Sequence, residues 1–324
     1  KYSLYTAEAS GADNTGKLSA STSDTVRHTL FVYLLLTAVF VVALSLTGMA
    51  FWPAVNLTFT NISSGGFSVY SDSIASLSMT QKYVLAGCMF CSGINFALLY
   101  HFITFRWRRI RHKLDQFSFY FVLYLVSVMG VFGVLHFRMG QQWSSALCDS
   151  VVQCISALTT TGSVVADTTQ WWVPVTFWLM LLSLCGGMAG STTGGLKVMR
   201  VLILRRNVRN ILHNYLHPNA VHPVRLNGTP VSHSIINNVM VIFFVYLFTI
   251  VVGILALMLC GVNATESIGA MVSCITSYGP GMGLSGGFGS YAAFPLAAKL
   301  ICSLAMLMGR LECLTFIVLF LPLF

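Results

Sequence analysis

Charge is what this sequence lacks most. Only 8% of its 324 residues are charged, whereas a soluble domain carries about 25%. Proline is also sparse, with 8 residues, while hydrophobic residues make up 56% of the chain. A chain of this composition has too little polar surface to cover a soluble globule. The sequence therefore predicts an integral membrane protein.

Motifs of enzymes and metal sites are missing as well. The chain has no Walker motif, no HExxH and no GxSxG, so we expect no covalent chemistry and no nucleotide control within it. Its 9 cysteines do not fall into ligand-like spacings. Cys88 and Cys91 form a CxxC inside an apolar run, without a second pair at zinc-finger distance. We interpret the cysteines as buried small hydrophobes.

The net charge of +9 comes from basic runs that directly follow apolar segments. One run occupies 106–113, and the other comprises Arg200, Arg205, Arg206, Arg209 and Arg225. Such runs can bind nucleic acid or anionic lipid, but next to a membrane span they are typical of cytoplasmic loops. We therefore expect a cytoplasmic location for both runs, contact with membrane lipid, and no nucleic-acid partner.

Runs of about 20 apolar residues predict membrane spans. Six are present, at roughly 26–49, 82–105, 117–137, 173–204, 234–260 and 292–323.

Three shorter apolar stretches lie between these spans. They occupy 51–59, 143–158 and 265–275, and a polar loop containing glycine follows each of them. A helix of this length is too short to cross a bilayer, so we interpret each as re-entrant. Its loop can lie at membrane depth only if it lines water or is packed in protein. The order of span, half-length helix, loop and span occurs three times, which predicts an all-α polytopic fold with units at 1–113, 114–216 and 217–324, the last beginning with a cytoplasmic loop.

The glycine-containing loops suit a cation pathway. A dehydrated monovalent cation needs a ring of backbone carbonyls, and glycine lets carbonyls turn inward. The flanking Ser and Thr hydroxyls are neutral, whereas a ring of carboxylates would favour divalent cations. Ordinary external turns also favour Gly and Ser. Three loops at matching positions favour the filter interpretation.

The fourth span contains a second unusual segment, from Cys185 to Gly195, with five glycines. Such a segment does not form a stable helix interior. Gly186 and Gly190 have the spacing of GxxxG helix packing, but packing alone does not require Ser-Thr-Thr-Gly-Gly. We expect an unwound intramembrane loop, which can exist only where it lines a cavity or is buried in protein.

The last span contains Arg310, followed by Glu312. A charge inside a membrane costs several kcal/mol unless it is paired, so Arg310 is a candidate functional residue. A structural pair with Glu312 is the alternative, although residues two apart do not face each other on a helix. Three acidic residues, Asp149, Asp167 and Glu266, are predicted near the outer mouth. They either concentrate cations there or cap helices.

Several stretches together give the chain a resemblance to a known family. They are FTNISSGGFS at 59–68, SGINFAL at 92–98, TTTG at 159–162, GGMAGSTTGGLKVMR at 186–200, HPNAV at 217–221, GPGMG at 279–283 and GRLE at 309–312. The chain resembles the TrkH-type potassium uptake subunits of the Trk/Ktr/HKT cation transporter superfamily. The resemblance covers nearly the whole chain, and it implies four repeats around one pore, three of which are present. The first repeat is expected in a preceding N-terminal part.

The resemblance also implies site residues. Carbonyls that bind the transported K⁺ are implied for Ser63, Ser64, Gly65, Gly66, Thr159, Thr160, Thr161, Gly162, Thr276, Ser277, Tyr278 and Gly279. A gate is implied for Gly186, Gly187, Gly190, Ser191, Thr192, Thr193, Gly194 and Gly195 with Arg310, and Lys197 either assists it or extends to the cytoplasmic face. Ser163 and Pro280 stand where the first loop has Phe67, so the symmetry is approximate.

The resemblance further implies potassium uptake as a homodimer in the bacterial inner membrane. It implies a cytoplasmic nucleotide-binding regulatory subunit of the TrkA type as a partner. The alternatives are a sodium-permeable or ion-coupled cation symporter of the same superfamily and a polytopic membrane protein without a pore.

Overall fold

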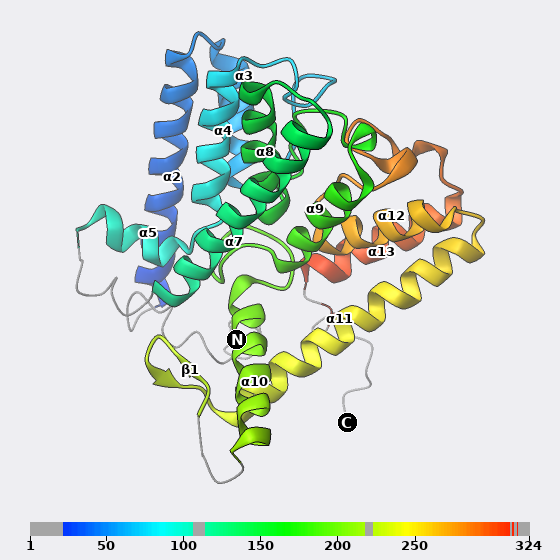
Figure 1. Cartoon of the computed structure of the whole chain (residues 1–324). Helices are drawn as coiled ribbons and strands as arrows, with labels where there is room; N and C mark the ends of the chain where they lie inside the picture. The colour runs from blue at the N-terminus through cyan, green and yellow to red at the C-terminus, as the bar shows by residue number, and fades with distance from the viewer. Residues whose placement is uncertain (1–21, 106–113, 218–222, 312, 314–315, 317–324) are drawn as a thin grey trace.

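The computed structural model of the chain describes residues 22–105, 114–217, 223–311, 313 and 316, and these residues are mostly helical (Figure 1). The first basic run, at 106–113, lies outside the described residues, as do Glu312 and most of HPNAV. The described helices repeat one order three times: a long helix, a half-length helix, a short segment at its end and a further helix. The short segments are 63–66, 159–162 and 276–279, and they are called strands below because they run alongside one another, although they form no β-sheet.

The first unit contains four helices. They are α2 (Thr22–Leu46), α3 (Phe51–Ile62), α4 (Met79–Ser92) and α5 (Phe96–Ile103). The start of α4 is fixed by a capping box, in which Ser78 Oγ accepts from Gln81 N and the Gln81 side chain accepts from Ser78 N.

The apolar run at 82–105 predicts one span, but it is not one continuous helix, because the chain bends by 107° between α4 and α5. The break lies at Gly93–Asn95. The Asn95 side-chain oxygen caps α5 by accepting from Ala97 N at 2.8 Å and Leu98 N at 3.2 Å. Gly93 O accepts from Met188 N at 2.9 Å. Because the helix is broken here, Gly93 O can accept a hydrogen bond from the distant glycine-rich segment.

The second unit begins with α7 (Leu114–Gly133), which continues as the π-helical turn η3 (Val134–Arg138). The half-length helix α8 (Trp143–Leu158) and the short η4 (Thr168–Gln170) follow. The predicted fourth span is divided into α9 (Val173–Cys185) and α10 (Val198–Leu216), and residues 186–197 between them are not helical. The expected break in this span is confirmed, although α10 extends well past residue 204.

The third unit opens with a small hairpin, β1 (Arg225–Leu226) and β2 (Thr229–Pro230), around Asn227 and Gly228. It is bound to two helices through one carboxylate, since Asp115 Oδ2 accepts from Asn227 N at 2.9 Å and from Arg206 Nη1 at 2.8 Å. The helices α11 (His233–Leu259), α12 (Ala264–Thr276) and α13 (Leu296–Arg310) follow, with η5 (Gly283–Ser285) and η6 (Tyr291–Ala293) before α13.

The described residues contain fewer full-length spans than the six predicted. Within the described residues, three helical stretches are long and apolar enough to cross a membrane, at Thr25–Leu46, Leu114–Arg138 and His233–Leu259, and the bent pair α4–α5 would make a fourth. The fourth predicted span is broken by its glycines. The sixth runs beyond the described residues after Arg310 and Leu311.

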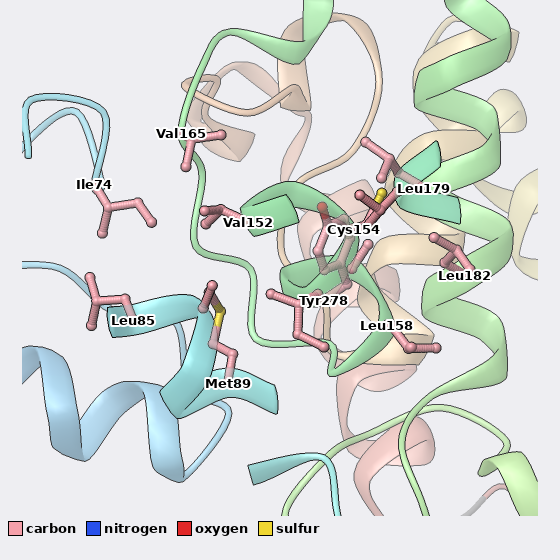
Figure 2. Packing of buried hydrophobic residues seen from close by; sticks show 14 of the residues in the cluster. Ile74, Leu85, Met89, Val152, Cys154, Leu158, Val165, Leu179, Leu182 and Tyr278 are labelled. Atoms are coloured by element: carbon pink, nitrogen blue, oxygen red, sulfur yellow. The ribbon is translucent and has the colours of Figure 1, made fainter. Parts of the chain in front are cut away.

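The three predicted half-length helices are confirmed as α3, α8 and α12. They pack at the centre of two buried clusters, one formed chiefly by α2, α3, α4, α7 and α8, the other by α11, α12 and α13. Figure 2 shows the first cluster where the strand after α12 enters it, with Tyr278 beside Cys154 and Leu158 of α8. Tyr278, which follows α12, thus belongs to the cluster that contains α3 and α8.

Candidate functional site

The three half-length helices end in the same backbone shape. In each unit the second residue of the strand is a left-handed non-glycine residue and the fourth is a left-handed glycine. The second residues are Ser64, Thr160 and Ser277, with φ of 56°, 51° and 57°, and the fourth are Gly66, Gly162 and Gly279, with φ of 67°, 83° and 99°. Alternation of this kind turns successive carbonyls in a regular way, so the three predicted loops form one structural motif.

The hydrogen bonds at the C-terminal ends of the three half-length helices follow one pattern as well. The third residue of each strand donates its N–H to the carbonyl five residues earlier: Gly65 to Thr60 at 2.7 Å, Thr161 to Ser156 at 2.9 Å, and Tyr278 to Ser273 at 3.0 Å. The helix C-terminus, with its partial negative charge, therefore leads directly into each strand.

The three strands lie side by side. A Cβ atom on Gly66 would fall well inside 3.0 Å of Thr161 O, and one on Gly162 well inside 3.0 Å of Tyr278 O. Glycine is needed at both positions for two reasons, the positive φ and the close approach of a carbonyl. The predicted residues of 63–66, 159–162 and 276–279 thus lie next to one another, with Thr161 O and Tyr278 O against glycines of neighbouring strands.

One of the predicted carbonyls is already bound. Gly279 O accepts a hydrogen bond from Tyr291 Oη of η6 at 3.1 Å. Tyr291 was not predicted as a site residue, since only the fold brings a residue twelve positions along the chain back to the strand.

The glycine-rich segment 186–195 lies against two of these strands. Gly194 N donates to Thr160 Oγ1 at 2.7 Å, and the hydroxyls of Thr192 and Ser64 lie 2.8 Å apart. Thr192 Oγ1 also donates to Ile62 O at 2.7 Å, at the end of α3. Both strand residues in these contacts are the left-handed ones. The segment is therefore connected to the strands at the point where each leaves its helix.

Internal contacts hold the same segment in a compact turn. Gly187 N donates to Thr193 Oγ1 at 3.1 Å, and Ser191 Oγ lies 2.8 Å from Thr193 Oγ1. Lys197, itself left-handed with φ of 71°, donates from Nζ to Thr193 O and to Ser191 O. The Lys197 ammonium is thus directed back into the segment, where it neutralises carbonyl charge.

Two residues of the first unit, Asn95 and Phe96, also hold the segment. Asn95 Nδ2 donates to Ala189 O, and Phe96 N donates to Gly190 O at 3.1 Å. Asn95 lies within a stretch that carries the family resemblance, and an Asn before an apolar helix is a capping signal. That signal was available in the sequence, whereas its pairing with residue 189 was not.

Arg310 lies at the end of α13 and reaches the segment. Its Nη1 donates to Thr192 O at 3.3 Å, and the side chain is exposed. Its neighbour Gly309 packs on α12 so closely that a Cβ there would fall well inside 3.0 Å of Ile275 O. The structure thus brings together Arg310, residues 191–194 and the strands. The alternative partner of Arg310, Glu312, is outside the described residues.

Two of the three acidic residues predicted near the outer mouth, Asp149 and Asp167, accept hydrogen bonds from neighbouring side chains. Asp167 caps η4 and accepts from Thr169 N at 3.0 Å, Thr169 Oγ1 at 2.7 Å and Gln170 Nε2 at 3.1 Å. Hydrogen bonding from the Thr169 side chain holds the pKa of the Asp167 carboxyl below its ordinary value. Asp149 is buried in α8 and accepts from Gln141 Nε2 at 2.7 Å, while Glu266 lies in the first turn of α12. For Asp167 these contacts favour the capping interpretation.

Known proteins are similar to this chain in sequence and in fold. The family model of TrkH, a cation transport protein, matches residues 1–129 and 118–323. The Trk system potassium uptake protein TrkH of Salmonella typhimurium is 30% identical, and that of Halomonas elongata 31% identical, each over 99% of this chain and 66% of its own length. The TrkG protein of Escherichia coli is 30% identical over 98% of this chain.

A solved structure is also similar. The crystal structure of the potassium transporter TrkH from Vibrio parahaemolyticus matches with a TM-score of 0.85 and 25% identity, covering 94% of this chain and 65% of that one. The chain thus spans about two thirds of the length of the relatives it matches. The apolar spans and these matches identify a multi-pass protein of the inner membrane. The chain belongs to the TrkH family of cation transport proteins.

Proposed function

We propose that this chain takes part in potassium uptake, with the strands 63–66, 159–162 and 276–279 as its share of a carbonyl selectivity filter. The observation that carries the proposal is the threefold recurrence of the left-handed residue and left-handed glycine at the ends of α3, α8 and α12. Carbonyl oxygens replace the hydration shell of a monovalent cation, and the three helix C-termini add partial negative charge.

The gate in this proposal is the glycine-rich segment 186–195 together with Lys197 and Arg310. The bonds from Thr192 and Gly194 to the strand residues Ser64 and Thr160 support it, since the segment must move or loosen before an ion can pass beneath them. Arg310 adds a positive charge at the same place, which repels potassium.

Partners are part of the same proposal. The relatives are named as potassium uptake proteins of a Trk system. We propose that this chain works as a homodimer with a cytoplasmic nucleotide-binding subunit, as its membership of the TrkH family implies.

Growth of a potassium-uptake-deficient bacterium on low potassium tests the proposal. Expression of the full natural protein is expected to restore growth, and uptake by the cells is expected to fall when potassium is replaced by sodium. No rescue by a well-expressed protein would count against potassium uptake. Equal uptake of the two ions would favour a sodium-permeable transporter instead.

A further inference from the structure

Two amide side chains on the half-length helices are completely buried and are not among the site residues discussed so far. Asn61 lies on α3 and Gln153 on α8, and both have 0% exposure. Burying an amide is costly unless its hydrogen bonds are made inside the protein. The partners of these two amides therefore indicate what the side chains do.

Gln153 connects α8 to the strand of the next unit. Its Nε2 donates to Tyr278 Oη at 3.0 Å, and its Oε1 accepts from Val165 N at 3.3 Å, so both ends of the amide are used. Tyr278 belongs to the strand that follows α12, yet its ring packs in the cluster of α8 (Figure 2). The ring thus extends out of its own unit to reach Gln153, while its carbonyl lies against Gly162.

Asn61 makes the corresponding connection one unit earlier. Its Oδ1 accepts from Ser163 Oγ at 3.0 Å, and its Nδ2 donates to Leu57 O at 2.7 Å. Ser163 directly follows Gly162, and its carbonyl accepts from Ser156 Oγ at 2.7 Å. The end of the second strand is therefore held from both sides, by its own helix α8 and by α3 of the unit before.

The two connections run in the same direction around the site. In each case the half-length helix of one unit binds the strand of the following unit, first at Ser163 and then at Tyr278. The glycine contacts run the same way, from Gly66 to Thr161 O and from Gly162 to Tyr278 O. Adjacent strands are thus joined by a close backbone contact at the glycine. In addition, the half-length helix of one unit binds the strand of the next through a buried amide side chain.

We propose that Asn61 and Gln153 are positioning residues of the filter, which set the spacing between adjacent strands and thereby the preference for potassium over sodium. This inference rests on the proposed filter function. Neither side chain needs to touch the ion. Each limits how far the neighbouring carbonyls can move toward a smaller cation, because a shift of the strand would break a hydrogen bond to a buried amide.

The test is a double-mutant cycle on Gln153 and Tyr278 in the full natural protein. Tyr278→Phe removes only the hydroxyl, and Gln153→Met replaces the amide by an apolar chain of similar length. We expect each variant to lower the ratio of potassium to sodium uptake by about fivefold, the factor that one hydrogen bond supplies. The double variant should lower the ratio no further than Gln153→Met alone, because the bond that Tyr278→Phe removes is already absent in Gln153→Met.

A matched control is available in Tyr246→Phe. Tyr246 is a buried tyrosine on α11, and within the described chain its hydroxyl has no hydrogen-bond partner. Removing that hydroxyl should leave the uptake ratio unchanged. Ser163→Ala extends the test to Asn61, since it deletes one hydroxyl in a small side chain, and it should lower the ratio in the same way even if the Tyr278 variants do not fold.

The outcomes separate the inference from the proposed function. If the unsubstituted protein takes up potassium selectively and Ser163→Ala and Tyr278→Phe keep its ratio, the inference is overturned, even if both variants lose thermal stability. If the unsubstituted protein shows no preference for potassium, the proposed function fails first. A lowered ratio in the variants but not in Tyr246→Phe supports the positioning role.

Discussion

Ser64, Thr160 and Ser277 adopt a backbone conformation that non-glycine residues rarely occupy. Each left-handed residue costs about 1–2 kcal/mol relative to ordinary backbone. The same cost recurs at the same strand position in three units with different surroundings, so it reflects a shared requirement. In two of the units the carbonyl of the residue that follows, Thr161 or Tyr278, lies against the glycine of the preceding strand. Strain of this kind is concentrated at functional sites.

Gly162→Ala is expected to abolish the preference for potassium. An added Cβ would press on Tyr278 O and displace that strand, in addition to the cost of a positive φ. The uptake ratio of potassium to sodium measures the effect. Gly261→Ala is the control, because Gly261 also has a positive φ, of 86°, but has nothing within 4 Å of an added Cβ. An unchanged ratio in Gly162→Ala would refute the filter assignment.

Arg310→Ala is expected to raise potassium uptake in the absence of any activating partner. The substitution removes both the positive charge and the hydrogen bond to Thr192 O. Arg310→Lys keeps the charge without the planar fork of donors, so it should raise uptake less. Potassium uptake at matched expression is the measurement. Reduced uptake in Arg310→Ala with normal expression would point to a structural role instead.

Among the elements, the unwound backbone of the glycine-rich segment was predicted most directly by the sequence. Five glycines among residues 185–195 predict unwound backbone inside an apolar run, and the structure has it at 186–197. The bend in 82–105 could not be predicted from apolar composition, because α4 and α5 are both apolar. The turn depends on the Asn95 cap of α5 and on the pairing of Asn95 with residue 189. Apolar length predicts where helices occur but not whether two of them are collinear.

Thr160→Val is expected to loosen this segment. Valine keeps the branched shape but removes the oxygen that accepts from Gly194 N, which leaves a buried N–H without a partner at a cost of about 1–3 kcal/mol. If the bonded segment is the closed gate, potassium uptake should rise about fivefold or more. Thr160→Ser keeps the oxygen and should behave like the natural protein. Equal uptake in the two variants would contradict a gate that closes through this bond.

Gly309→Ala is expected to push α13 away from α12. The new methyl group would meet Ile275 O, one residue before the strand, and overpacking of this kind costs about 1–3 kcal/mol. Thermal unfolding of the purified protein in detergent measures the loss. Gly130→Ala on α7 is the control, since an added Cβ there meets nothing within 4 Å and alanine favours helix by up to about 1 kcal/mol. Equal unfolding temperatures would show that α13 is not held at Gly309.

For the whole molecule, local signals predicted the helical fold, the half-length helices and the strands, because each depends on residues close in sequence. The pairings that build the site were not predictable in that way. Gln153 with Tyr278 and Asn61 with Ser163 join residues more than a hundred positions apart. The hairpin at Asn227–Gly228 did carry a local signal, since Asn-Gly is typical of tight hairpins. Its attachment through Asp115 to Arg206, however, required the fold.

Orientation in the membrane is a property of the whole molecule that two single cysteines can test. The basic residues of α10 predict a cytoplasmic location for that helix, and the loop between α3 and α4, which contains Ser71, reaches the opposite end of the molecule (Figure 1). Arg209 on α10 and Ser71 before α4 are both exposed. In intact cells a membrane-impermeant thiol reagent should label Ser71→Cys but not Arg209→Cys, and disrupting the membrane should make both reactive.

The natural protein is the control for this labelling, because its own cysteines, which are buried or only partly exposed, give the background signal. Labelling of Arg209→Cys in intact cells would reverse the orientation, and the strands would then follow half-length helices that enter from the cytoplasmic side.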